Sequence, residues 1–79
     1  MYRVKDRTGP IVGLGYFVCD FICDTLDDIG TLPTSSAEGT GGVTEYDNQK
    51  CASGSIAYIS GEADNKFYML NNQDVWEPQ

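Results

Sequence analysis

The sequence predicts a small, mostly β protein. Three observations indicate this fold class: β-branched and aromatic residues gather in short runs, nine glycines separate those runs, and hairpin signals fill the last third. With 79 residues the chain has room for one domain. We expect that domain to span residues 11–79, preceded by a basic extended arm over residues 1–10.

The last third of the chain has the clearest pattern. Residues 55–59 and 66–70 are two apolar and aromatic runs joined by a turn that contains Gly61. A second turn leads to a short third run at residues 75–77. These runs predict a three-stranded antiparallel meander at the C-terminus.

The most apolar segment lies upstream, at residues 14–23. At a period of two, Phe17, Cys19, Phe21 and Cys23 share one face, which favours a strand buried mostly on that side. The length of the run keeps a helix open as the alternative. We expect the meander to pack against this segment.

Two connecting segments follow the apolar run. Residues 24–30 predict one short helical turn, with Asp24 or Thr25 as its N-cap and Gly30 at its end. Residues 34–42 are rich in glycine, serine and threonine and predict a flexible loop.

The net charge of −7 is unevenly distributed. Arg3, Lys5 and Arg7 outweigh Asp6, so the first seven residues have a net charge of +2, whereas the other 72 have −9. An acidic body repels phosphate backbones, so we expect no nucleic-acid partner for it. No segment reaches the roughly 18 apolar residues of a membrane span, so no membrane partner is expected either.

The three cysteines, Cys19, Cys23 and Cys51, are an odd number, which argues against a closed disulfide framework. Small buried thiols in a reducing cytoplasm are the expected interpretation. The chain has no histidine to act as a base or a metal ligand. We therefore expect no enzyme, no catalytic residues, no metal and no cofactor.

The meander aromatics lack the basic groove that a nucleic-acid platform needs, so they are expected to form core or subunit interface. A domain this small has a marginal core, and short strands with open edges invite other chains. A homo-oligomer is therefore expected. The candidate core and interface residues are Tyr58, Phe67, Tyr68, Leu70, Trp76, Arg3, Lys5 and Arg7.

Several short motifs of the C-terminal part form a recurring pattern. They are Gly54-Ser55-x-Ala57-x-Ile59, Lys66-x-Tyr68-x-Leu70-Asn71 and Trp76-Glu77, preceded by Ile29-x-x-Leu32-Pro33-Thr34. This pattern resembles one found in small virion proteins of tailed bacteriophages. It covers about residues 29–77, whereas residues 1–24 match no family that we can name.

The resemblance implies a non-enzymatic structural component of a phage particle, made in the host bacterial cytoplasm and located in the virion. The expected position is on the head, as a decoration, fibre or head–tail adaptor protein. It would oligomerise and bind other virion proteins, such as capsid or head–tail proteins.

Other functions remain open. A tail, baseplate or tail-fibre component is the alternative within the same class. From a different class, a small acidic inhibitor that mimics nucleic acid and blocks a host protein would account for the charge of −7. A small secreted binding module is a third class, which the odd cysteine count disfavours.

Overall fold

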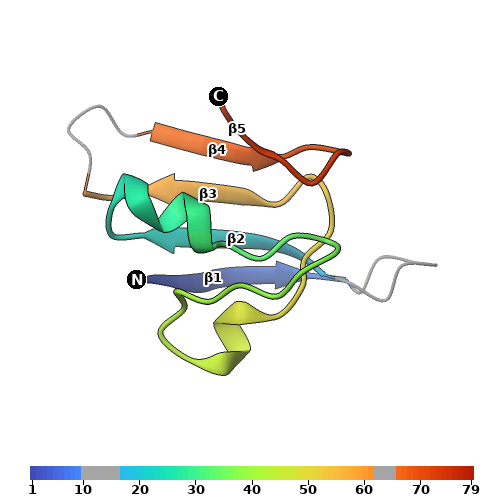
Figure 1. Ribbon diagram of the computed structural model, residues 1–79, viewed down its shortest axis with the longest axis horizontal. Coiled ribbons are helices and arrows are strands. Elements are labelled where there is room, and N and C mark those ends of the chain that lie inside the picture. Colours follow the sequence, from blue (N-terminus) through green and yellow to red (C-terminus); the bar gives the residue numbers. More distant parts are fainter. Residues whose placement is uncertain (10–16, 62–65) are drawn as a thin grey trace.

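The computed structural model describes residues 1–9, 17–61 and 66–79. Five strands form one mixed sheet in chain order, β1-β2-β3-β4-β5 (Figure 1). The strands are β1 (Tyr2–Thr8), β2 (Val18–Cys23), β3 (Ile56–Ile59), β4 (Lys66–Leu70) and β5 (Trp76–Pro78), and the 3-10 helices are η1 (Leu26–Thr31) and η2 (Glu45–Asn48). The mostly β fold class is confirmed. Within the described ranges, neither helix has the length and apolar character needed to cross a membrane.

The C-terminal meander has the predicted antiparallel order, with β4 paired to both β3 and β5. β4 covers the predicted residues 66–70, and β3 and β5 each begin one residue later than predicted. Residues 62–65, in the predicted turn, lie outside the described residues. The predicted strand over residues 14–23 is confirmed from Val18 onward as β2. Its first part, residues 14–16, also lies outside the described residues.

Two further pairings complete the sheet, because β1 runs antiparallel to β2 and β2 runs parallel to β3. Parallel neighbours need a long crossover connection, and residues 24–55 supply it. This connection contains η1 and η2: its first part, with η1, crosses one face of the sheet, and η2 lies beside the outer edge of β1 (Figure 1). Thr25 is the N-cap of η1, as expected, but the helix continues through Gly30 to Thr31. η2 was not predicted.

The core lies between the sheet and this connection. Phe21 is at its centre, with its ring edge-on to Tyr2 at 5.6 Å and to Trp76 at 5.9 Å between ring centroids. The Trp76 Nε1 donates to the carbonyl oxygen of Pro33 in the connection, at 3.1 Å. The buried apolar residues are Tyr2, Cys19, Phe21, Cys23, Leu32, Cys51, Ala52, Ala57, Ile59 and Leu70.

The basic N-terminal segment is extended, as expected, and forms the paired strand β1. Tyr2 on this strand is 1% exposed, and its hydroxyl oxygen lies 2.9 Å from the Thr31 carbonyl oxygen and 2.5 Å from Asn48 Oδ1. A Cβ at Gly39 would lie 1.9 Å from that hydroxyl, and one at Gly41 would lie 2.2 Å from the Thr31 Oγ1. The glycines of the loop therefore leave the room that the Tyr2 side chain occupies.

Both outer edges of the sheet are blunted, which changes the expectation of open edges. On β1, the Tyr2 amide donates to Gly41 at 3.2 Å, and the Tyr2 carbonyl accepts from the Val43 amide at 2.9 Å. The Val4 amide donates to the Asp47 Oδ1 at 2.8 Å. At the other edge, β5 has three residues and ends at Pro78. Short strands and prolines are poor templates for another strand, so edge-to-edge pairing is disfavoured.

Asp47 joins β1 to η2 through its carboxylate. Besides the Val4 amide, it accepts from the Thr44 amide at 3.0 Å and the Thr44 hydroxyl at 2.9 Å. Burial alone would raise the pKa of Asp47, but these three donors outweigh burial and hold the pKa below its usual value of 3.8.

All three cysteines are buried and unbridged, as expected. Burial raises the pKa of both the Cys23 and Cys51 thiols to about 12, and it also raises the pKa of Cys19. Thiolate is the reactive form, so these thiols are protected both by packing and by protonation.

Gly39→Ala should lower the free energy of unfolding by about 1–3 kcal/mol, because the new methyl group would overlap the Tyr2 hydroxyl and the Thr31 carbonyl. Gly30→Ala is the matched control, since a Cβ at Gly30 meets nothing within 4 Å. Urea denaturation of both variants tests this, and equal stability of the two would contradict the packing argument.

The stability of the protein should fall on acidification below about pH 4, because the lowered pKa of Asp47 stabilises the fold only while its carboxylate is charged. This contribution is present above 3.8 and is lost as the pH falls through the lower folded value. Asp47→Asn should flatten the pH dependence between pH 5 and pH 3, whereas Glu45→Gln, an exposed neighbour in η2, should leave it unchanged. Thermal melts at each pH measure the difference.

Thiol reagent at pH 8 should react slowly with the native protein and should find three free thiols after denaturation without reductant. The raised pKa values predict that native reactivity increases only at strongly alkaline pH. Detection of a single thiol in the denatured protein would mean that a disulfide bond had formed.

Candidate interaction surface

The face of the sheet opposite the connection has no covering layer among the described residues. Because successive side chains of a strand point to opposite faces, the strand register assigns residues to this side. We call it the open face, and it comprises Arg3, Lys5, Asp6, Thr8, Val18, Asp20, Ile22, Ile56, Tyr58, Phe67, Met69 and Glu77.

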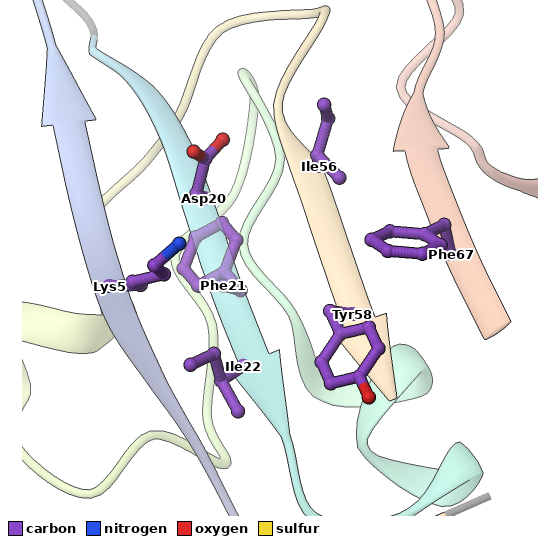
Figure 2. Close-up of a pocket in the computed structure, with 7 residues that line it drawn as sticks. All are labelled: Lys5, Asp20, Phe21, Ile22, Ile56, Tyr58 and Phe67. Atoms are coloured by element: carbon purple, nitrogen blue, oxygen red, sulfur yellow. The ribbon is translucent and has the colours of Figure 1, made fainter. Parts of the chain in front are cut away.

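The middle of the open face is apolar and hollowed. Figure 2 shows the side chains around the hollow, with Ile22 from β2, Ile56 and Tyr58 from β3 and Phe67 from β4. Its volume is about 400 Å³, and the residues that line it are Lys5, Asp20, Phe21, Ile22, Ile56, Tyr58 and Phe67. The Tyr58 and Phe67 rings are in contact, with 5.0 Å between their centroids and a tilt of 47°.

Several of these apolar side chains are open to solvent. Phe67 is 46% exposed and Met69 is 37% exposed, although both lie on β4, which is paired on both sides. Contiguous apolar patches on soluble domains mark sites of association, because their burial removes apolar area from water. The open face is therefore the candidate functional site.

Charge on the open face is arranged by strand. Arg3 and Lys5 lie on β1 at one side, and Glu77 lies on β5 at the other side. Asp6 and Asp20 face each other across the β1–β2 pair. These five residues sum to −1, so the open face is nearly neutral in a chain of net charge −7.

The structure separates the predicted core and interface residues into two groups. Leu70 is buried, and Tyr68 and Trp76 pack against the core. Tyr58 and Phe67 instead lie on the open face, in contact with each other. Tyr68 and Trp76 therefore belong to the core side of the sheet, whereas Tyr58 and Phe67 are the candidates for an interface.

The basic residues also separate. Arg3 and Lys5 lie on the open face, but Arg7 points to the covered side. There the Arg7 guanidinium lies 3.8 Å from the Tyr46 ring centroid and 5.0 Å from that of Phe17. It donates to the Tyr46 carbonyl at 3.0 Å and to Gln49 Oε1 at 2.9 Å. Arg7 thus holds η2 against the sheet and is not available to a partner.

Four apolar members of the open face were not predicted as site residues: Val18, Ile22, Ile56 and Met69. A signal for them exists in the sequence. In β2 and β3 both alternating sets contain apolar residues, whereas a strand with one solvated face alternates apolar with polar residues. That pattern indicates a sheet with two faces to bury.

The described residues offer little catalytic chemistry. They contain no group of three or more side chains that could hold a metal ion. A second hollow of about 590 Å³ lies beside η2, and the residues that line it are Glu38, Gly39, Glu45, Tyr46, Asn48 and Gln49. The three buried thiols have raised pKa values and do not reach either hollow.

Comparisons with protein-family models, with curated proteins and with solved structures found no match for this chain.

Proposed function

We propose that this chain is a non-enzymatic structural component of a bacteriophage particle, located on the head as a decoration, fibre or head–tail adaptor protein. It acts by oligomerising and by binding other virion proteins. The observation that carries the proposal is the open face: an apolar, nearly neutral sheet surface on an acidic protein whose sheet edges are blunted.

The geometry favours a binding role over a catalytic one. The chain lacks histidine, and its thiols are buried, so neither an imidazole base nor a reactive thiol faces solvent among the described residues. The open-face hollow has an apolar lining with one carboxylate and one amine, Asp20 and Lys5. Such a surface suits contact with another apolar surface.

Residues of the motifs that resemble phage virion proteins are buried or form hydrogen bonds between strands in this fold. The Ser55 hydroxyl donates to the Ala52 carbonyl at 2.7 Å and accepts from the Cys19 amide at 3.0 Å, which joins β2 to the start of β3. Ala57 and Leu70 are buried. The resemblance therefore supports a meander built in the same way as in those proteins. The virion setting of the proposal also rests on this resemblance.

The acidic residues weigh against the inhibitor alternative. A nucleic-acid mimic needs rows of free carboxylates, but five of the acids in the described residues bind groups of their own chain, Asp24 and Glu77 among them. Asp28 accepts from the N-terminal ammonium group at 3.0 Å, Asp47 accepts from Val4, and Asp74 accepts from the Ser35 hydroxyl at 2.5 Å. The open face itself has both signs of charge.

Mass spectrometry of purified particles tests the proposed setting. In particles from the host strain that expresses this chain, we expect many copies per virion and the same copy number after a salt wash. A tail or baseplate role would give the chain in purified tails and not in tail-less heads. Abundance in the lysate together with absence from particles would contradict the proposal, and a soluble phage protein from the same lysate serves as the control for carry-over.

A further inference from the structure

The size of the open face limits what can occupy it. Four strand spacings of about 4.8 Å and a rise of about 3.3 Å over the six residues of β2 give a face of about 19 by 20 Å. The resulting area of about 380 Å² is about half of what each partner buries in a specific interface between two domains. The face therefore matches a single element of secondary structure better than a second copy of the chain.

A helix is the element that can lie on a sheet face without leaving its backbone unpaired. The central strands use their N–H and C=O groups within the sheet, so an extended segment laid over them would find no backbone partners. The blunted edges also disfavour an added strand beside β1 or β5. A helix pairs its own backbone groups and needs only an apolar stripe toward the sheet.

The strand register places apolar residues between two carboxylates. One row crosses β2, β3, β4 and β5 through Asp20, Ile56, Met69 and Glu77, in that order. The two carboxylate positions are three strand spacings apart, about 14 Å, and a helix with its side chains is about 10–12 Å wide. A helix over Ile56 and Met69 would therefore have a carboxylate on either side, within reach of lysine or arginine side chains that flank its apolar stripe.

The charges of Asp20 and Glu77 are available to such a helix. The ion pairs between described residues both involve the N-terminal ammonium group, and Glu77 accepts from the neutral Asn71 amide. Arg3 and Lys5 lie on β1, one strand beyond Asp20, and so outside the width of a helix over β3 and β4. The net charge of −7 adds a long-range attraction for a cationic partner.

We propose that the open face binds one amphipathic helix of another protein, about 13 residues long, with basic residues on both sides of its apolar stripe. The apolar side chains enter the hollow beside Ile56 and Phe67, and the basic ones meet Asp20 and Glu77 (Figure 2). Apolar anchors at positions i, i+3, i+4 and i+7 are the pattern of a helix bound in this way. The inference rests on the proposed function and deepens it, because it names the class of partner that this surface takes.

Selection from a displayed library of random peptides, each of about 16 residues, tests the class of partner. The immobilised full chain should enrich peptides with apolar residues at i, i+3 or i+4, and i+7, flanked by lysine or arginine. These peptides should gain helical circular dichroism when the protein is added. No enrichment, apolar residues at every second position, or an excess of acidic residues would each contradict the proposal.

Titration calorimetry with the most enriched peptide, made synthetically, tests the surface. Phe67→Asp should raise the Kd at least about tenfold, because it places a charge among the apolar anchors. Val75→Asp is the matched control, since Val75 is 52% exposed, lies outside the strands and should leave the Kd within about twofold of the wild type. Met69→Asp repeats the test at a second position, and thermal melts confirm that each variant is folded.

Two charge reversals test the flanking carboxylates. Asp20→Lys and Glu77→Lys should each raise the Kd about three- to tenfold, because each replaces an attraction with a repulsion. Asp27→Lys is the control, since it changes the net charge equally at an exposed position of η1, on the covered side of the sheet, and should raise the Kd less than about twofold. Equal effects of the three variants would mean that only net charge matters and would overturn the assigned row.

The outcomes separate this inference from the proposed function. A wild type that dimerises below about 1 mM in sedimentation velocity, and loses the dimer with Phe67→Asp, would assign the face to a second copy and overturn the helix. Equal peptide binding by the wild type and Phe67→Asp would overturn the surface. The expected binding by a chain that is absent from particles would sustain the inference and contradict only the virion setting, whereas presence in particles without peptide enrichment would do the reverse.

Discussion

The fold depends on the placement of one tyrosine at the start of the chain. The hydroxyl of Tyr2 reaches Thr31 and Asn48, so a single ring joins β1, the end of η1 and the end of η2. Burial raises the pKa of Tyr2 to about 12, which keeps the hydroxyl protonated and able to donate. The ring fits only because Gly39 and Gly41 have no side chains. This contact fixes the basic strand to the crossover connection, next to the β1 edge that Gly41, Val43 and Asp47 close.

The two faces of the sheet differ because only one long connection lies within the part of the chain that the structure describes. Residues 24–55 supply the covering layer for one face, through Leu32, Cys51 and the contact between Pro33 and Trp76. No comparable segment remains among the described residues to cover the other face. A sheet with apolar residues on both sides and one internal layer leaves apolar area in contact with water, which is the physical basis of the proposed binding role.

The alternation of side chains along the sequence predicted those strands and buried residues that depend on neighbours close in the chain. The runs at residues 55–59 and 66–70 and the burial of Phe21 and Cys23 follow from side-chain alternation. The parallel β2–β3 pair has no local signal, because its partners are brought together by the intervening connection. The same limit applies to the candidate site. Phe67 could be recognised as core or interface, but whether its side of the sheet is covered depends on the path of residues 24–55. For the same reason, the sequence could not tell that Arg7 packs on the covered side against Tyr46 while Arg3 and Lys5 lie on the open face.

The parallel pair has a consequence for how the protein folds. Pairing of Asp20 with Ile56 closes a loop that contains the whole crossover, and loop closure of this length is slow compared with formation of the adjacent β3–β4 hairpin. During synthesis, β1 and β2 leave the ribosome well before β3 exists to join them. The five-stranded sheet can therefore be completed only after β3, β4 and β5 have emerged, so β2 waits for its parallel partner during synthesis.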